Sequence, residues 1–277
     1  MKRDLTLGPL AAAAAIACLS MGLFSSARSP ALAQEGPRTL VAIFAHPDDE
    51  QAVSPILARY AREGVKVHLV IATDGQKGVR EHAGIPAGEA LATARAAEAR
   101  CACEKLGIGP PILLGLVDGE LQTNPNRQAL LGEIARIFVE LKPDVVLTWG
   151  PDGVTGHTDH RMVSNLVTQV VQRGAPDAPG QLLYAGISAE AVAAVPAPAG
   201  RGPLRGLATV QDRFLPVRVA YEPQDAAAAE RSLACHASQY TAEEAAGMSR
   251  MTRGAERGSV RLRPWFVDPG PLTDLFE

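Results

Sequence analysis

Short apolar runs alternate with alanine-rich, amphipathic runs along the chain from residue 39 onward. The short runs are rich in Val, Ile and Leu and predict strands, whereas the longer runs between them predict helices. The expected strands of the first half are 40–45, 65–73, 112–116 and 144–149, and the expected helices are 50–63, 89–106, 126–141 and 159–173. Continuously apolar strands separated by helices are typical of parallel sheets. The pattern therefore predicts an α/β fold, a Rossmann-like doubly wound, mostly parallel sheet with helices on both faces.

The pattern is less regular after residue 173. Residues 174–206 are rich in Gly, Pro and Ala around one apolar run, 182–187, and we expect a strand and a long surface loop there. Beyond this segment we expect a strand at 216–221, a helix at 224–240 and a final edge strand at 259–267. The chain has no internal repeat, so residues 34–277 are expected to form a single domain.

Residues 1–33 have the organisation of an export signal. A short basic start precedes an apolar, alanine-rich stretch, and Ala31-Leu32-Ala33 has the small-x-small form that signal peptidase cuts. We therefore expect a signal peptide over 1–33, cleaved after Ala33, and a secreted or periplasmic protein. Two alternatives stay open: an uncleaved membrane anchor, because the stretch approaches the ~20 residues of a bilayer span, and a lipoprotein modified at Cys18. The protein is expected to contact a membrane only if this segment is retained.

Composition narrows the class of protein further. Of the 277 residues, 47% are hydrophobic and 21% are charged, which is enough to bury a full core without a bias toward disorder. The net charge of −3 argues against nucleic acid as a partner.

Three cysteines follow the predicted signal peptide. Cys101 and Cys103 are two positions apart in an expected helix, so their side chains diverge and are not expected to pair with each other. Cys235 could pair with either of them, and the sequence does not decide between the two. A framework of several disulfides is not indicated.

Two polar clusters follow predicted strands and precede predicted helices. FAHPDDE places His46 and three acids after the first strand, and GHTDHR places His157 and His160 after the fourth. Because the carboxyl ends of parallel strands meet at one edge of a sheet, both clusters are expected at the same rim. Adjacent acids repel each other, and a helix N-terminus offsets this only in part, whereas a divalent cation offsets it more fully.

The spacing within each cluster indicates a metal site. His46 and Asp49 are three residues apart across an expected first helical turn and can point to one spot, with Asp48 beside it. His157 and His160 likewise share a face. Two imidazoles and a carboxylate around one point, with a position left for water, are the donors of a catalytic zinc site. Zinc brings the pKa of such a water toward ~7, and Asp48 is the candidate base that accepts its proton.

Each cluster alone has a simpler explanation. HPDDE fits a helix start with a solvated acidic first turn, and a single HxxH pair is a weak signal. Their joint occurrence after two strands of one sheet favours the metal site. Among the remaining histidines, His68 is expected to be structural, His82 to be solvated or to border the pocket, and His236 to pack in a helix, support the rim or contact substrate.

The pair AHPDDE and GHTDHR resembles the two signature motifs of the LmbE-like, or PIG-L, family of zinc-dependent de-N-acetylases. The likeness extends from Thr39 to about Gln239. Short stretches between and after these motifs also resemble family patterns: TDG at 73–75, RAAE at 95–98, LVDG at 116–119 and HASQ at 236–239. Two positions depart from the family pattern, Gln76 in place of a frequent glutamate and Thr158 in place of a common proline, and neither is an expected metal ligand.

The resemblance implies a role for each residue of the clusters. It implies one zinc ion per chain, bound by His46, Asp49 and His160, and a water activated by Asp48. It also implies that His157 lies over the substrate carbonyl as an acid or oxyanion stabiliser.

Four further residues complete the expected site. The resemblance implies, less specifically, that Arg95 and Asp118 contact the sugar. Glu50 and Asp159 are expected to support the metal ligands from behind.

The function that follows is removal of an N-acetyl, or other N-acyl, group from an amino sugar or glycoconjugate. Two other classes stay open. Two histidines and one carboxylate also form the facial triad of non-haem iron oxygenases, although those usually have all-β folds. An exported, non-catalytic sugar-binding module of the same fold is the other alternative, although all the catalytic groups are retained here. The identity of the sugar and of the acyl group is not legible in the sequence.

Overall fold

The structure is a computed structural model that describes residues 37–174, 177–194, 206–265 and 273–274. The expected signal peptide at 1–33 and most of the loop expected before residue 206 lie outside the described residues. Within the described residues, no helix combines the length and the apolarity that a membrane crossing requires.

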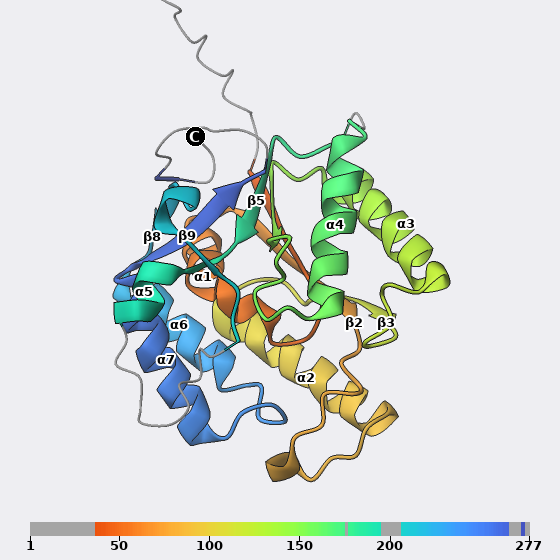
Figure 1. Ribbon diagram of the computed structural model, residues 1–277, viewed down its shortest axis with the longest axis horizontal. Helices are drawn as coiled ribbons and strands as arrows, with labels where there is room; N and C mark the ends of the chain where they lie inside the picture. The colour runs from red at the N-terminus through yellow and green to blue at the C-terminus, as the bar shows by residue number, and fades with distance from the viewer. Residues whose placement is uncertain (1–36, 175–176, 195–205, 266–272, 275–277) are drawn as a thin grey trace, which may run out of the picture. The chain divides into compact units, whose positions relative to one another are not determined.

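A seven-stranded sheet lies at the centre of the described part, in the order β3-β2-β1-β4-β5-β9-β8 (Figure 1). Its strands are β1 Thr39–Phe44, β2 Lys66–Thr73, β3 Ile112–Leu116, β4 Val145–Trp149, β5 Gln181–Ala185, β8 Val217–Ala220 and β9 Ser259–Pro264. The first five are parallel, and β9 is antiparallel to both of its neighbours. The expected doubly wound, mostly parallel sheet is therefore confirmed.

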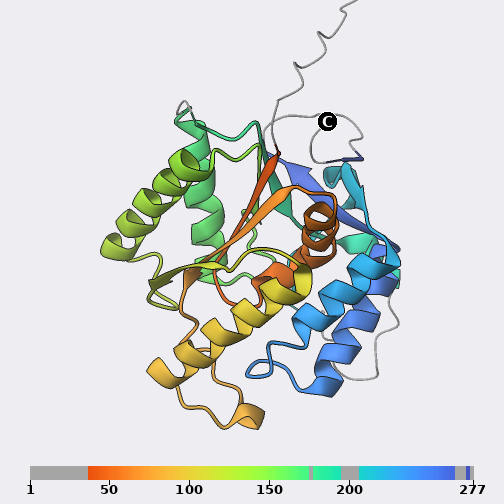
Figure 2. The same cartoon turned by 180° about the vertical axis from the view of Figure 1, so that it is seen from behind.

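Helices cover both faces of this sheet (Figures 1 and 2). One face carries α1 (Ser54–Arg62), α2 (Glu89–Leu106) and α6 (Pro223–Leu233), and the other carries α3 (Asn124–Leu141) and α4 (Thr158–Gln172). The remaining elements are α5 (Ala189–Ala194), α7 (Ala242–Glu256), the short strands β6 (Ile187–Ser188) and β7 (Thr209–Val210), and the 3-10 turns η1 (Asp49–Ala52), η2 (Glu81–Ala83) and η3 (Asp212–Phe214).

The central strand β1 shows why the apolar runs are continuous. Leu40 and Phe44 pack with the cluster that includes the core side of α1, whereas Val41 and Ile43 pack with side chains of α3 and α4. Each such side chain contributes about 1.5–3 kcal/mol when fully buried. Both faces of β1 are therefore fixed, which gives the residues that follow it a rigid base.

Three expectations about the elements were wrong in detail. Strand β9 lies between β5 and β8 and is not an edge strand, because the chain returns antiparallel after α7. The helix expected at 50–63 is divided into η1 and α1, so the acids of HPDDE are not the first turn of an α-helix. Helix α6 ends at Leu233, and a separate helix α7 follows.

A capping motif in the sequence explains where α7 begins. Thr241 and Glu244 form a capping box, in which each side chain accepts a hydrogen bond from the other residue's backbone N–H. This T-x-x-E signal marks the start of the new helix α7 at Ala242.

The structure pairs Cys101 with Cys235 in a disulfide whose Cα atoms are 5.8 Å apart. It joins α2 to the segment that follows α6. Cys103 is a buried free thiol, and burial raises its pKa to about 12. The choice that the sequence left open thus falls on Cys101.

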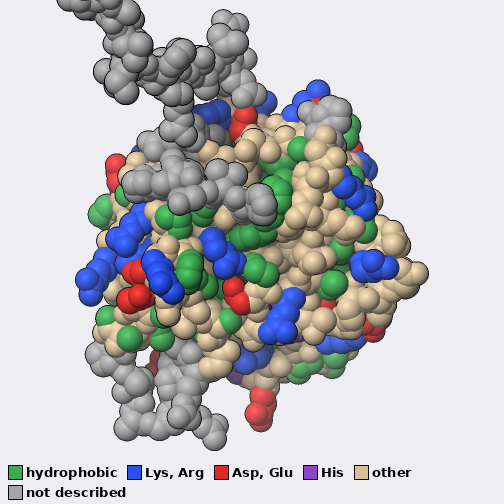
Figure 3. Space-filling view, turned by 45° about the horizontal axis from the view of Figure 1, so that its top comes forward, with side chains coloured by type: hydrophobic (Ala, Val, Ile, Leu, Met, Phe, Trp, Pro, Cys, Tyr) green, Lys and Arg blue, Asp and Glu red, His purple; other side chains and the backbone are tan. Residues whose placement is uncertain are grey.

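The face shown in Figure 3 carries Lys and Arg side chains interspersed with Asp and Glu and with apolar side chains. Mixed charge of this kind agrees with the small net charge of −3.

Candidate metal centre and active site

The two polar clusters meet where the strand order reverses. Strands β1 and β4 are parallel neighbours, and the chain leaves them toward β2 on one side and β5 on the other. His46 follows β1, and His160 lies in the first turn of α4, after β4. Ligands of doubly wound sheets bind in the crevice at this point. The expectation that both clusters share one rim is confirmed by the distance of 3.1 Å between His46 Nδ1 and His160 Nε2.

Three side chains converge within this crevice. Besides the contact between the two imidazoles, His160 Nε2 lies 3.3 Å from Asp49 Oδ1, and His46 Nδ1 lies 3.6 Å from Asp49 Oδ2. All three side chains are buried. They are the three residues expected to bind the metal.

His160 is oriented by its other ring nitrogen. Its Nδ1 lies 2.9 Å from the carbonyl oxygen of Gly153 and 3.2 Å from Thr155 Oγ1. A carbonyl only accepts hydrogen bonds, so Nδ1 carries the proton. The lone pair of Nε2 then faces His46 and Asp49.

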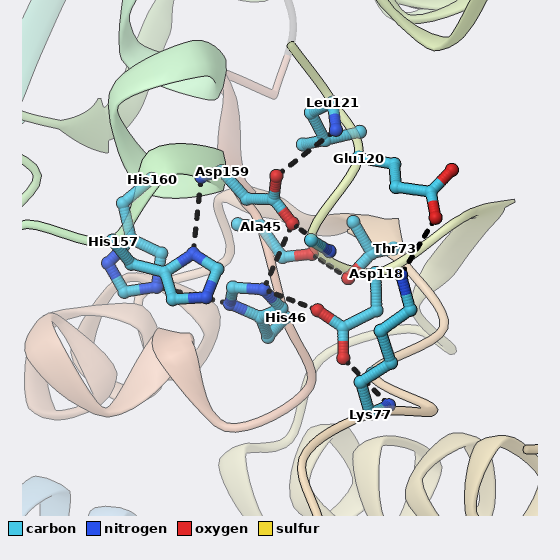
Figure 4. A network of polar contacts seen from close by, with 12 residues as sticks. Ala45, His46, Thr73, Lys77, Asp118, Glu120, Leu121, His157, Asp159 and His160 are labelled. Atoms are coloured by element: carbon cyan, nitrogen blue, oxygen red, sulfur yellow. Dashed lines mark hydrogen bonds and ion pairs between the residues drawn. The ribbon is translucent and has the colours of Figure 1, made fainter. Parts of the chain in front are cut away.

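His46 is oriented in the same way (Figure 4). Its Nε2 lies 3.2 Å from Asp118 Oδ1 and 3.4 Å from Asp159 Oδ2, which places the ring proton on Nε2. In the neutral ring, the Nδ1 lone pair therefore faces the lone pair of His160 Nε2 across 3.1 Å. Two lone pairs and a carboxylate repel one another unless a cation lies among them, so the donor set fits a divalent metal such as zinc.

Asp49 is held as an anion in this cluster. Its Oδ2 accepts hydrogen bonds from the backbone N–H groups of Ala45 (3.0 Å) and His46 (2.9 Å) and from Trp149 Nε1 (3.1 Å). Burial raises the pKa of Asp49, but His160 and His46 outweigh this and leave the pKa well below its usual value. Oδ1 is thereby left to face the imidazoles.

Two other groups of donors lie within 4.8 Å of one another, and both include His46: one with His157 and His160, the other with Asp118 and Asp159. In the second group His46 would have to use Nε2. The carboxylates there already accept hydrogen bonds from backbone N–H groups, which suits supporting groups better than ligands. The tautomers thus favour the set with Asp49.

Burial and the acids act in opposite directions on His46. Burial lowers the pKa of His46, but Asp118, Asp159 and Asp49 together raise it well above its usual value. The same contact with His46 helps to lower the pKa of Asp118 to about 2, although burial alone raises it. The cluster is therefore rich in negative charge and favours a cation.

Asp48 lies beside the ligands in a strained conformation. Its backbone has φ 103° and ψ −14°, a region that is costly for a residue other than glycine. The carboxylate is fixed at both oxygens: Arg95 Nη2 lies 3.0 Å from Oδ1, and the hydroxyl of Tyr240 donates to Oδ2 at 3.0 Å. Burial raises the pKa of Asp48, Arg95 opposes this, and the net pKa is raised. A more basic carboxylate suits a proton acceptor.

Arg95 and Asp118, the two expected sugar contacts, are buried. Arg95 also donates to the carbonyl oxygens of Gly75 and Pro47, so its guanidinium is fixed in the position from which it contacts Asp48. Asp118 Oδ2 accepts from the backbone N–H of Lys77 at 2.9 Å. Both residues therefore support the cluster, and their contact with a sugar stays a prediction.

Glu50 and Asp159 occupy supporting positions. Glu50 Oε1 lies 2.6 Å from His236 Nε2, and Glu50 Oε2 accepts from the backbone N–H of Asp48 at 3.1 Å. Glu50 and His236 are fully buried. Asp159 accepts from the N–H groups of Gly119 and Leu121. His236 thus supports the rim, one of the alternatives that the sequence left open.

His157 lies at the mouth of the cluster. It is exposed, and its ring centroid lies 4.7 Å from that of His46. Its Nδ1 accepts a hydrogen bond from the backbone N–H of Asp159 at 3.2 Å, so the ring proton is on Nε2. Burial and the neighbouring histidines His46 and His160 lower its pKa. The lowered pKa favours a neutral His157 ring, whose Nε2–H is available as a donor.

Sequence reasoning missed two residues of the site. Trp149 donates to Asp49 and stacks on His160, with ring centroids 4.7 Å apart and an interplanar angle of 12°. Tyr240 donates to Asp48. Trp149 ends a strand at the rim, which was a usable signal, whereas Tyr240 reaches Asp48 over 192 residues of sequence and gave none.

Comparisons with known proteins find similar sequences and similar folds. The family model PIG-L, described as GlcNAc-PI de-N-acetylase, matches residues 41–171. The 1D-myo-inositol 2-acetamido-2-deoxy-alpha-D-glucopyranoside deacetylase of Rhodococcus jostii is 35% identical over 156 residues, which cover 49% of this chain and 53% of that protein. The chain thus spans about half the length of this relative.

Solved structures resemble the fold over most of the chain. An N,N'-diacetylchitobiose deacetylase from Pyrococcus horikoshii has a TM-score of 0.62 at 18% identity and covers 82% of this chain and 84% of its own. The 4-carboxy-2-hydroxymuconate hydratase GalB from Pseudomonas putida has a TM-score of 0.57 at 15% identity, with 83% and 97% covered. The second protein is named for a different reaction, so the likeness shows the fold, and the function has to be argued from the site.

Proposed function

Because residues 41–171 carry a PIG-L family domain, we propose that this protein is a metal-dependent amide hydrolase that removes the N-acetyl group from an amino-sugar substrate. The observation that carries the proposal is the convergence of His46 Nδ1 and His160 Nε2, 3.1 Å apart, beside the carboxylate of Asp49. We assign one zinc ion per chain to these three ligands.

A bound zinc ion would polarise the amide carbonyl and lower the pKa of a water molecule beside it. Asp48 then takes the proton from the attacking water. Its carboxylate lies next to the ligand Asp49 and is partly exposed, and its pKa is raised by burial, which favours proton uptake. Arg95 and Tyr240 keep both oxygens in place, so that little reorganisation precedes the proton transfer.

His157 acts on the other side of the amide. Its Nε2–H can donate to the carbonyl oxygen as negative charge develops there, and a donor that is already oriented stabilises this charge. The same imidazole can pass its proton to the departing amine. The products are acetate and a free amino sugar.

The names of the similar proteins support the substrate class. The Rhodococcus jostii relative is named for an acetamido sugar joined to inositol, and the Pyrococcus horikoshii protein is named for diacetylchitobiose. We propose that Arg95 and Asp118 help to place the sugar ring. We further propose that the protein acts outside the cytoplasm, on the basis of the signal-like sequence at 1–33, and that it contacts a membrane only if this segment is retained.

Acetate release tests the proposed function. The purified protein, loaded with zinc, is incubated with N-acetylglucosamine glycosides before and after treatment with a chelator. Acetate is expected from the zinc-loaded protein, lost after chelation and restored by added zinc. A chelated protein that releases acetate at an unchanged rate contradicts the proposal.

The same preparation separates the two alternative classes. Metal analysis after purification without added metal is expected to find zinc, whereas iron together with substrate-dependent oxygen consumption would indicate an oxygenase. Heat of sugar binding without any acetate would indicate a binding module.

A further inference from the structure

A mostly apolar cavity of about 210 Å³ lies beside the metal cluster. Its walls come from the ends of β4 and β5, from β9 and from α5 and α7, which lie together on the side of the sheet away from β2 and β3 (Figure 1). The apolar side chains that line it include Trp149, Ile187, Val192, Met248 and Met251. This volume is far more than an acetyl methyl group needs.

The cavity shares walls with the cluster. Trp149 lines the cavity, and the same indole donates to Asp49 and stacks on His160. Val154 also lines it, with φ 56°, which is a strained value for a β-branched residue. The neighbouring Gly153 accepts the hydrogen bond that orients His160. A group bound in the cavity therefore lies against the residues that fix two metal ligands.

Two buried donors of the cavity wall have no hydrogen-bond partner among the described residues: Gln51 Nε2 and Arg261 Nε. Nη1 of the same Arg261 guanidinium donates to Ser188 and Asp212, whereas Nε is buried without an acceptor among the described residues. Buried donors are rarely left unsatisfied in proteins. Neither donor atom has surface that a ligand in the cavity can reach, so the apolar side chains decide what the cavity accepts, and they suit a hydrocarbon group.

We propose that this cavity is a substrate subsite for the hydrocarbon part of an N-acyl chain longer than acetyl. The inference rests on the proposed amide hydrolysis. An amide carbonyl held at the cluster has the sugar nitrogen on one side and the acyl chain on the other. The β2–β3 side carries Lys77, Asp118 and Glu120, whose polar groups suit sugar hydroxyls (Figure 4). The hydrocarbon acyl chain would then lie in the apolar cavity beside β5 and α7.

A series of substrates measures the subsite. The kcat/KM values for N-acetyl-, N-butyryl- and N-hexanoylglucosamine are compared on the zinc-loaded protein. Each methylene buried in an apolar site favours binding about fourfold, so the hexanoyl substrate is expected to exceed the acetyl substrate by about tenfold or more. Equal kcat/KM values for the three substrates overturn the subsite.

Variants locate the effect. Ala255→Phe on α7 and Val192→Phe on α5 each fill the cavity from a different helix, so one can fail to fold without ending the test. Either one should reduce the ratio of hexanoyl to acetyl kcat/KM to about one. Ala246→Phe, an exposed position on α7 that does not line the cavity, is the matched control and should keep the wild-type ratio. A wild-type ratio in both filled variants overturns the proposal.

The outcomes separate this proposal from the function beneath it. Acetate release without any preference for longer chains leaves the hydrolase standing and overturns the subsite. A preference seen only among hexyl and methyl glycosides of N-acetylglucosamine assigns the cavity to the aglycone and overturns the acyl assignment.

If no amide is cleaved, the hydrolase fails, and calorimetry on the same zinc-loaded protein still tests the cavity. Binding of N-hexanoylglucosamine that is about tenfold tighter than that of N-acetylglucosamine, and lost in Ala255→Phe, supports it. Equal affinities contradict it.

Discussion

The two halves of the sheet contribute to the site in different ways. The parallel half, β3-β2-β1-β4-β5, supplies all the proposed metal ligands and the proposed base from short segments after β1 and β4. The antiparallel extension consists of β9 and β8 with α6 and α7. From it, Tyr240 donates a hydrogen bond to Asp48 and His236 contacts Glu50. Its α7 and β9 also form two walls of the apolar cavity. The comparison indicates that the proposed reacting groups come from the parallel half alone, whereas the groups that position them, and the walls of the proposed acyl subsite, come from both halves.

If the parallel half carries the chemistry, the largest loss of activity should follow from removing one of its proposed metal ligands. Asp49→Ala is expected to abolish zinc binding and to lower kcat by about a thousandfold or more, because both metal activation and the orientation of His46 are lost. Zinc content and acetate release measure the two effects. The matched control is Glu140→Gln, an exposed acid on α3 that pairs with Arg136 and is not part of the site. An Asp49→Ala protein that retains zinc contradicts the ligand set.

The next largest effect is expected at the base. Asp48→Asn keeps the shape of the side chain and removes its capacity to take a proton, so kcat should fall by about 10²–10⁴-fold. Its zinc content should equal that of the wild type, since Asp48 is not a proposed ligand. An unchanged kcat would remove Asp48 from the mechanism.

A smaller loss of activity is expected when the hydrogen bond from the antiparallel extension to Asp48 is removed. Tyr240→Phe removes the hydrogen bond to Asp48 Oδ2 and should lower kcat by about tenfold, the cost of one hydrogen bond to a charged group. KM should change little, because the hydroxyl contacts the base rather than the substrate. A change in KM alone would instead place Tyr240 against the substrate.

The smallest effect on activity, and a large one on stability, is expected from the disulfide that ties the extension to α2. Cys101 and Cys235 are 134 residues apart, so Cys235→Ser should lower the free energy of unfolding by about 2–4 kcal/mol. The folded protein should retain most of its kcat, because α6 still packs on α1 and α2. Thermal unfolding and acetate release measure these together. Cys103→Ser is the control, since this buried thiol is unpaired.

The parallel half was largely predictable from the sequence, because strong signals coincide there. The strand at 112–116 and the helix at 89–106 have the predicted bounds, and both polar clusters follow strands whose apolar runs are unbroken. Parallel topology then brings His46 and His160 together without any knowledge of side-chain contacts.

The antiparallel extension was less predictable for a physical reason. The position of β9 between β5 and β8 depends on pairing between segments far apart in sequence, which leaves no local pattern. The strained backbone of Asp48 is also set by its surroundings, because Arg95, Tyr240 and Glu50 hold it from three elements. The α-helix expected at 50–63 therefore begins only at Ser54, after the 3-10 turn η1.

The central claim is that His46 Nδ1, Asp49 and His160 Nε2 share one metal ion. Anomalous diffraction at the zinc edge, from crystals of the zinc-loaded protein, tests it most directly. The predicted result is a single peak at about 2.0–2.2 Å from one atom of each of these three side chains. A peak on the other side of the His46 ring, at Nε2 between Asp118 and Asp159, would contradict it.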